Sequence, residues 1–527
     1  MTSKTHMNQL TRALRILTAA GFLTCGLLPA WAQQDGSSSG STSGSTDSGQ
    51  AGSAPSGSAS SAPDQGNGAP PAATTPAGPD IENPPLSGLD EPSSELAFGG
   101  RSYLVPGIQL SESVNSISSG LGSKTSGTDE TARGLGSLDL QKIWKTNQLA
   151  LDYIAGGTLL QGHVTQAHLG RSYQTHSFAL DERHLWRTGQ LVFRDSLNYL
   201  PEGSFGFGSY GGAGGFGSSL GGGGTSGGAG TGLGGGITGG IPGGSFGGGT
   251  IGSVGIQPRI DNLSVIDLTQ SFSPRSTVVA AVAYDYTNFL TNAQTSLALI
   301  NSQMSSAQLG YDYLVNNHDR LSVSYSYQTF HFPSAGSGNV EAHAWHVLYS
   351  HRISGRLNLV FGGGPQLLIF HNPLISVPSK ITGSGRAQLS YQANLRTTTQ
   401  ISYMHYTSAG SGFFAGANTD VVNASLTRLE GRTWSFSVNG GYSRNSQLQK
   451  SALGASTAST YDYFYGGSSI RRQLGRYFGA FVSYQYSDMR FNSGAVVCTT
   501  PTSCGNSSGS QVGLVGIDWH PHPFRLD

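Results

Sequence analysis

The sequence predicts an all-β fold: a transmembrane antiparallel up-and-down β-barrel of about 16–18 strands, preceded by a disordered N-terminal segment. Three observations support this prediction. Runs of about ten residues alternate apolar and polar side chains, short turns alternate with long connections, and only 11% of the 527 residues are charged. Soluble proteins usually contain about 25% of Asp, Glu, Lys and Arg.

The stretch "RLSVSYSYQTFHF", residues 320–332, shows the alternation most clearly. Leu321, Val323 and Tyr325 alternate with Ser322 and Ser324. Successive side chains of a strand point to opposite faces, so this strand has one apolar and one polar face. The same pattern recurs in "QLALDYIA", "STVVAAVAYDY", "AQLGYDYL", "RAQLSYQANL", "TWSFSVNGGY" and "GAFVSYQYSD". No run after residue 32 approaches the roughly 20 apolar residues of a membrane helix.

The connections favour a membrane barrel over a soluble sandwich. Short turns are expected near residues 145–147, 185–188, 273–276, 316–319, 354–356, 395–397, 429–432 and 473–476. Long connections are expected near 117–132, 159–170, 201–259, 289–302, 332–339, 369–385, 407–418, 444–459 and 489–509. Outer-membrane barrels combine short periplasmic turns with long external loops and an even number of strands. A sandwich has no reason to segregate its loops this way. We therefore expect both termini in the periplasm.

One predicted strand does not fit the pattern. In "QLVFRDSLNYLP" the apolar face that carries Leu191, Phe193 and Leu197 also carries Asp195. A charge facing the middle of the bilayer costs about 2–4 kcal/mol for Arg or Lys and less for Asp. We expect either a bulge that resets the register or a position of Asp195 near a rim.

Residues 1–32 have the features of a secretory signal peptide. Lys4, Arg12 and Arg15 precede an apolar stretch at 16–28, and Ala30 and Ala32 form a small-x-small cleavage site. We predict export and cleavage after Ala32. The alternative is a lipoprotein signal, with lipidation of a cysteine at position 25. Thr24 just before this cysteine and the apolar run that continues beyond it fit such a signal poorly. With the predicted barrel, export indicates the outer membrane of a Gram-negative-type bacterium.

Residues 33–100 form a Gly/Ser/Pro-rich segment with almost no bulky side chains, which predicts a disordered periplasmic linker. The segment contains no Lys or Arg and eight acids: Asp35, Asp47, Asp64, Asp80, Glu82, Asp90, Glu91 and Glu95. Three of the 29 basic residues lie in the signal peptide and eight of the 29 acids lie here. The predicted barrel, residues 101–527, therefore keeps 26 basic and 21 acidic residues, a net charge of +5.

Two cysteines remain after removal of the signal peptide. Cys498 and Cys504 enclose five residues in "VVCTTPTSCGN". In an exported chain such a pair predicts a disulfide that closes a surface loop. No His or acid lies beside them, so they do not indicate a metal site.

The chain resembles bacterial outer-membrane β-barrels of the porin-like kind over residues 101–527, with Trp144, Trp186, Trp345 and Trp519 at predicted strand ends. The stretches "ENPPLSGLDEPSSE", "RSYLVPGIQLSESV" and "FRDSLNYLPEGSFGFG" resemble an uncharacterised subfamily with a Pro-rich lead-in. The resemblance implies contact with membrane lipid and with the barrel-assembly machinery. Such barrels usually end on an aromatic residue, whereas Phe524 lies three residues before the end here. We expect Trp519 to close the last strand.

The most distinctive insert is residues 203–255, which contain 28 glycines. It belongs to the third long connection, and in many porins that loop folds inward and narrows the pore. The alternative is an external disordered skirt, because glycine loses much conformational entropy when it is ordered. No Lys-Ser/Thr pair follows the glycines, so the insert is not a phosphate-binding loop.

Neither a metal site nor an active site is predicted. The candidate histidines are His343, His346, His351, His520 and His522. His343 and His346 would face opposite sides of a strand, and prolines follow both His520 and His522, so we expect rim or lumen histidines. Barrel enzymes need a nucleophile and a base within hydrogen-bond reach, and no Ser–His pair stands out. The sequence predicts neither enzymatic activity nor a cofactor.

Basic residues on the predicted inward faces are the candidate functional residues. Such residues would line the lumen and tune selectivity, with a slight anion preference from the +5 balance, or would pair with acids and brace the wall. The candidates are Arg183, Arg187, Arg194, Arg386 and Arg428.

Two functions follow from these observations. The first is a passive channel for small polar solutes or ions, because a porin-sized barrel leaves an aqueous channel unless loops fill it. The alternative is a plugged barrel that serves an assembly for polysaccharide or protein export, with residues 33–100 binding a periplasmic partner. The sequence predicts no nucleic-acid partner and specifies no oligomeric state.

Overall fold

The computed structural model describes residues 102–119, 127–162, 172–200, 259–289, 300–333, 338–372, 376–394, 396–410, 414–431, 433–449, 459–492 and 507–526. The predicted signal peptide, the 33–100 linker, the 203–255 insert and both Cys498 and Cys504 lie outside these residues. Across the described ranges, no helix has the length and apolar character needed to cross a membrane.

The described residues form strands joined by turns and connections. The strands are β1 (Tyr103–Ser119), β2 (Gly127–Ile143), β3 (Asn147–Gly162), β4 (Ser172–Trp186), β5 (Gly189–Leu200), β6 (Arg259–Ser273), β7 (Ser276–Phe289), β8 (Ser302–Leu314), β9 (Asp319–His331), β10 (Asn339–Ser354), β11 (Leu357–His371), β12 (Lys380–Asn394), β13 (Thr397–Ser408), β14 (Ala417–Glu430), β15 (Trp434–Gln447), β16 (Thr460–Gln473), β17 (Phe478–Phe491), β18 (Ser507–Trp519) and the short β19 (Phe524–Arg525).

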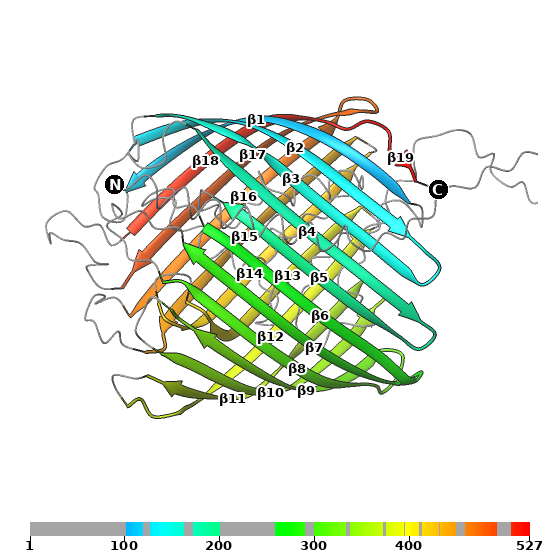
Figure 1. Cartoon of the computed structure of the whole chain (residues 1–527), viewed down its shortest axis with the longest axis vertical. Coiled ribbons are helices and arrows are strands. Elements are labelled where there is room, and N and C mark those ends of the chain that lie inside the picture. Colours follow the sequence, from blue (N-terminus) through cyan, green and yellow to red (C-terminus); the bar gives the residue numbers. More distant parts are fainter. Residues whose placement is uncertain are drawn as a thin grey trace, which may run out of the picture. The chain divides into compact units, whose positions relative to one another are not determined.

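Strands β1 to β18 close into a barrel (Figure 1). Each strand pairs antiparallel with the next one in the chain, and β1 pairs with β18, so that Ile108 lies opposite Trp519. Closure leaves no unpaired sheet edge, which a bilayer could not satisfy. The two-residue β19 continues the pairing of β1 beyond β18, with Phe524 opposite Leu104. The predicted all-β barrel is confirmed at 18 wall strands, and β18 ends at Trp519 as predicted.

The two rims of the barrel differ in the length of their connections. Turns of two to four residues join β2 to β3, β4 to β5 and each later even-numbered strand, up to β16, to the odd-numbered strand that follows it. These eight turns lie at the eight predicted places. We call this end the short-turn rim and the opposite end the long-connection rim. Gly431 and Gly475 lie in short turns at φ values of 66° and 101°, which favour glycine. Tyr103 and Trp519 place the two ends of the wall at the short-turn rim.

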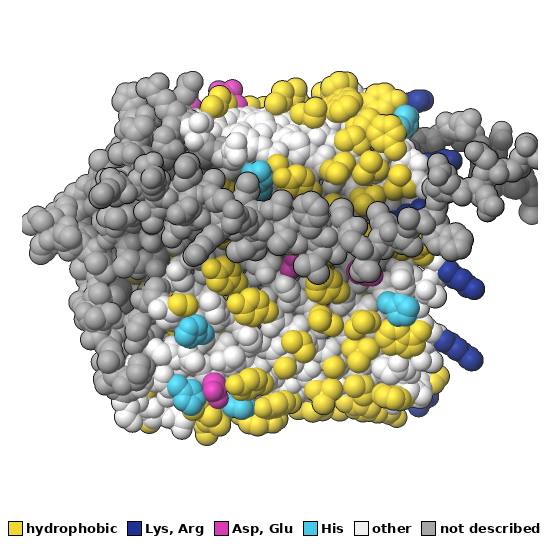
Figure 2. All heavy atoms as spheres, in the orientation of Figure 1, with side chains coloured by type: hydrophobic (Ala, Val, Ile, Leu, Met, Phe, Trp, Pro, Cys, Tyr) yellow, Lys and Arg dark blue, Asp and Glu magenta, His cyan; other side chains and the backbone are white. Residues whose placement is uncertain are grey.

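The two faces of the wall have opposite polarity. On β9, Val323 points outward and is 50% exposed, whereas Ser322 and Ser324 point inward and are buried. Leu309 on β8 and Val482 on β17 are likewise exposed outward. Figure 2 shows hydrophobic side chains spread over the described outer surface. The apolar face of the stretch at 320–332 is therefore the outside of the barrel, where only lipid can cover it.

The structure corrects our expectation for Asp195. The register of β5 with β4 and with β6 is continuous, so no bulge turns this residue inward. Asp195 lies outward in the middle of β5, opposite Ser264 of β6. Its carboxylate accepts hydrogen bonds from the Ser264 hydroxyl at 2.5 Å and from the Asn262 amide at 3.1 Å. These neighbours replace part of the solvation that the outer face withholds.

Candidate functional site

The candidate site is the inward wall of the barrel, where many polar side chains are interspersed with apolar groups such as Leu263 and Val265 on β6. The strand period of two turns every second residue of each strand inward. Inward-facing polar residues are buried on strands all around the barrel: Gln109, Thr131, Ser177, Gln308, Ser326, Gln366, Asn423, Ser443 and Ser510 are examples. A polar inner face inside an apolar outer face is the arrangement of an aqueous channel wall.

One sector of the wall is held together by ion pairs. Arg194 on β5 is 4% exposed and lies between two inward carboxylates on neighbouring strands. Its Nη1 donates to Asp267 Oδ2 at 3.0 Å, and its Nε is 3.5 Å from Asp181 Oδ2. Arg183 donates to the second oxygen of Asp181 at 3.0 Å. These contacts join β4, β5 and β6 across the wall.

A second pair of carboxylates faces inward on β2 and β3. Asp139 lies directly opposite Asp152 in the β2–β3 register. Their neighbours on the same face of β2 are Ser137 and Gln141, both buried. Like charges placed directly opposite each other on a sheet repel. The register therefore places two carboxyl groups side by side on the inner face of β2 and β3.

The opposite sector of the wall, β13 to β15, contrasts with these clusters. On β13, β14 and β15, the described inward side chains include Gln400, Thr419, Asn423, Asn439 and Ser443, none of which is charged. Thr419 donates to Asn445 at 2.8 Å, and the side chain of Asn445 donates to Ser443 at 2.9 Å. The lumen therefore presents ion pairs over β4 to β6, and hydroxyl and amide groups over β13 to β15.

An apolar cluster lies inside the barrel at the long-connection rim. Phe330 of β9, Val340 of β10 and Leu368 of β11 point inward there and are fully buried. Ala415, from the connection between β13 and β14, packs into the same cluster. We call this group the mouth cluster; its buried members are Met304, Phe330, Phe332, Val340, Ala342, Leu368, Phe370 and Ala415.

The β13–β14 connection reaches two distant parts of the wall. Phe414 is 1% exposed and packs on Tyr461 of β16, with the ring centroids 5.6 Å apart. Gly416 lies beside Phe332 at the end of β9; a methyl group on it would be 3.7 Å from that ring. β9 and β16 stand seven positions apart in an 18-strand barrel. The described part of this connection therefore folds inward and contacts the wall on both sides of its own strands.

For the 203–255 insert the sequence left open an inward fold or an external skirt, and that insert lies outside the described residues. The signal for the observed inward connection is the pair of phenylalanines in "AGSGFFAGAN", where the surrounding loop residues are small or polar. Gly410 and Gly416, at φ values of 85° and 83°, allow the tight path of this connection.

The five arginines predicted to line the lumen do not share one environment. Arg183 and Arg194 point inward as described, and Arg386 of β12 also points inward, close to His346. The prediction is wrong for Arg187, which lies in the β4–β5 turn and is exposed. It is also wrong for Arg428, which faces outward and donates to Glu430 at 2.7 Å. Both errors came from the assignment of a face close to a strand end.

The histidines lie apart from one another. His343 points outward and shares a hydrogen bond of 2.8 Å with Tyr325, whereas His346 points inward and bonds Ser384 at 2.7 Å. His520 contacts Asp518 inside the wall at 2.6 Å, and His522 stacks edge-on against Tyr477. Among the described residues no group of three His, Cys, Asp or Glu side chains could hold a metal ion.

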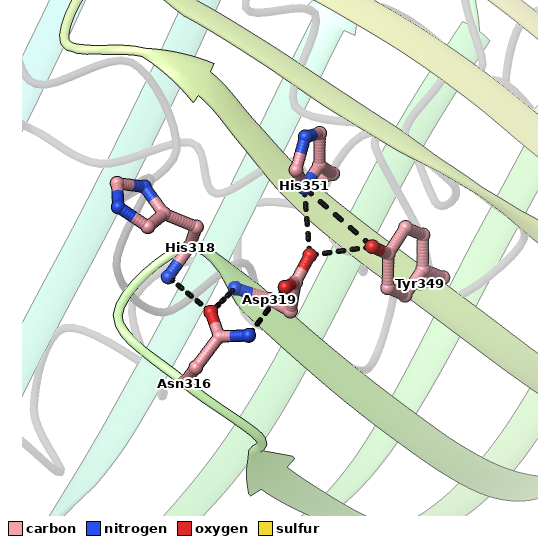
Figure 3. Close-up of polar contacts among 5 residues, drawn as sticks. All are labelled: Asn316, His318, Asp319, Tyr349 and His351. Carbon is pink, nitrogen blue, oxygen red and sulfur yellow. Dashed lines mark hydrogen bonds and ion pairs between the residues drawn. The ribbon is translucent and has the colours of Figure 1, made fainter.

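A polar cluster holds the β8–β9 turn at the short-turn rim (Figure 3). Asn316 accepts hydrogen bonds from the backbone N–H groups of His318 and Asp319, at 2.7 and 2.9 Å. Asp319 in turn accepts from Tyr349 and contacts His351 Nδ1 at 2.6 Å, both on β10. The hydrogen bonds from Tyr349, Asn316 and His351 lower the pKa of Asp319 to about 2. The cluster braces the turn against its neighbouring strand.

The closed strand pairing, the apolar outer face and the polar inner face together decide the class of protein. The chain is a transmembrane β-barrel of 18 wall strands. The predicted resemblance to such barrels is confirmed at the level of the fold.

No family model and no curated protein matches this sequence. Among solved structures, OpdQ of Pseudomonas aeruginosa is similar at 10% identity, with a TM-score of 0.38, over 80% of this chain and 98% of that one. OpdK of the same organism is 10% identical with a TM-score of 0.39, over 79% and 99% of the two chains. OccAB4 of Acinetobacter baumannii is 9% identical with a TM-score of 0.38, over 80% and 99%. The strand pairing of this chain, rather than these similarities, establishes its fold.

Proposed function

We propose that this chain is an outer-membrane channel that passes small polar solutes or ions by diffusion. The observation that carries the proposal is the difference between its two faces: apolar side chains cover the outside, whereas the inside carries many hydroxyl, amide and ion-paired groups among fewer apolar ones. A barrel of this strand number is wide enough to enclose water.

The geometry of the wall supports selection by size and by local charge. The β13–β14 connection folds inward at the long-connection mouth through Phe414 and Ala415. Below it, solutes would pass between the ion-paired sector around Arg194 and the uncharged sector of β13 to β15. Because the basic and acidic side chains of the first sector are paired with each other, we expect a weak charge preference and a stronger limit on solute size.

The proposal is tested by single-channel recording of the folded mature chain in a planar bilayer. We expect stable conductance steps that scale with salt concentration. A barrel that is shown to be folded by its heat-modifiable mobility on a gel, yet conducts nothing, would contradict the proposal. Recording with the salt concentration unequal on the two sides gives the ion preference from the reversal potential.

A further inference from the structure

Basic side chains are concentrated in the short turns. Seven of the eight turns contain one Lys or Arg, the eighth contains His318, and none contains Asp or Glu. Figure 2 shows dark blue side chains projecting beyond the short-turn rim. At the other rim, the connections 290–301, 332–338, 372–379 and 409–416 contain no charged residue at all. The other long connections carry only Lys124, Arg171, Glu202 and Lys450, so basic residues are denser in the short turns.

Six of these basic residues lie in the described turns, and all six are exposed; we call them the basic collar: Lys145, Arg187, Arg275, Arg356, Arg396 and Arg476. Within the described part of the chain none of the six forms an ion pair. Arg356 donates one hydrogen bond, to the Ala393 carbonyl at 3.1 Å. Three acids near this rim, Asp319, Glu430 and Asp518, already contact His351, Arg428 and Arg471, at 2.6, 2.7 and 2.7 Å. Six like charges around one opening create a positive potential that an anionic partner would relieve.

The chain itself supplies a segment of matching charge. Residues 80–95, "DIENPPLSGLDEPSSE", contain five acids in 16 residues, and no Lys or Arg occurs between residues 33 and 100. The segment precedes β1, whose first residues lie at the short-turn rim. Ser102 is fixed there, because its Oγ accepts from the Ile143 N–H at 3.1 Å and its carbonyl accepts from the Leu526 N–H at 3.2 Å.

The tether is short enough to keep the two charged groups together. Thirteen residues lie between position 88 and Ser102, and a flexible chain of that length spans about 20 Å. Such a tether holds the segment at an effective concentration on the order of 1 mM near the rim. We propose that the basic collar binds the acidic segment 80–95 of this same chain. Binding depends on the charges of the rim and does not rest on conduction through the barrel.

The test uses the full mature chain with a nitroxide label on Ser87→Cys, in a background of Cys498→Ser and Cys504→Ser. At low ionic strength we expect the electron paramagnetic resonance spectrum of the label to contain a component from slow motion of the nitroxide. This component should be lost at about 0.5 M salt, where the Debye length falls to a few ångström. The slow component should also disappear at low salt when the six collar residues are replaced by Gln. A spectrum independent of salt, or one unchanged by neutralising the collar, would overturn the proposal.

Two controls separate this binding from general charge effects. Arg444→Gln with Arg490→Gln removes two exposed cations on the outer wall towards the opposite rim, and should leave the label as slow as in the parent chain. Neutralising the segment instead, with Asp80→Asn, Glu82→Gln, Asp90→Asn, Glu91→Gln and Glu95→Gln, leaves the barrel sequence intact and should free the label. The second control keeps the proposal testable even if the collar variant does not fold.

Discussion

The ring of Phe414 packs on the ring of Tyr461, with 5.6 Å between centroids, although the first belongs to the β13–β14 connection and the second to β16. The contact holds the connection against the inner wall. On its other side, the neighbouring Ala415 joins the mouth cluster on β8 to β11. The position of the connection therefore depends on one buried aromatic residue.

Replacing Phe414 by Ala should widen the channel. Replacing a buried phenylalanine by alanine typically costs about 3–5 kcal/mol of stability. Here the substitution should destabilise the packing of the connection rather than the strands of the wall. We expect a larger single-channel conductance and faster proteolysis of the connection, with normal barrel folding. Phe361→Ala is the matched control, because Phe361 is an aromatic residue exposed on the outer face. Equal conductance in the two variants would show that Phe414 does not narrow the mouth.

Arg194→Gln should destabilise the barrel strongly. Arg194 is 4% exposed between Asp181 and Asp267, and its removal leaves Asp267 without that partner. Breaking a buried ion pair by removing one partner costs about 3–5 kcal/mol. Urea unfolding of the reconstituted protein measures this change. Arg183→Gln should cost less, because Arg183 is more exposed and Asp181 keeps Arg194. A similar loss in both variants would contradict this account.

A charge introduced on the outer face should cost more than the same charge on the inner face. Val482 points outward and is 56% exposed, whereas its neighbour Ser483 points inward. An Arg facing lipid costs up to about 2–4 kcal/mol, depending on depth. We expect Val482→Arg to lower the free energy of unfolding in bilayers by part or all of this amount. Ser483→Arg should lower the free energy of unfolding by less. A larger loss for Ser483→Arg than for Val482→Arg would contradict the assignment of the outer face to lipid.

Asp319 should stay ionised at unusually low pH. Hydrogen bonds from Tyr349, Asn316 and His351 favour its carboxylate and lower its pKa to about 2, against about 3.9 in an unfolded chain. Its stabilising contribution is therefore complete above about pH 4 and is lost as the pH falls towards 2. Carbon NMR of labelled Asp, assigned with Asp319→Asn, follows the titration. Tyr349→Phe should raise the pKa, and a midpoint near 4 in the parent chain would refute the role of these bonds.

The strands and turns could be predicted because their signals are local. The alternation of Leu321, Ser322 and Val323 depends only on the two-residue period of a strand, and it holds wherever one face meets lipid. The eight turns were found at the ends of these runs, and the strand count follows from them. Arg428 and Arg187 were misplaced because the alternation ends at the turns.

The sequence by itself determined a barrel with an apolar outside, a more polar inside and two unlike rims. Each of these properties follows from short runs of neighbouring residues. Only the tertiary structure decided which distant groups meet. Closure of 18 strands brings Phe414 to Tyr461, and strand pairing sets Arg194 between Asp181 and Asp267. Pairing register also left Asp195 outward beside Ser264. Such contacts depend on how strands far apart in the chain are aligned, and local periodicity carries no information about that alignment.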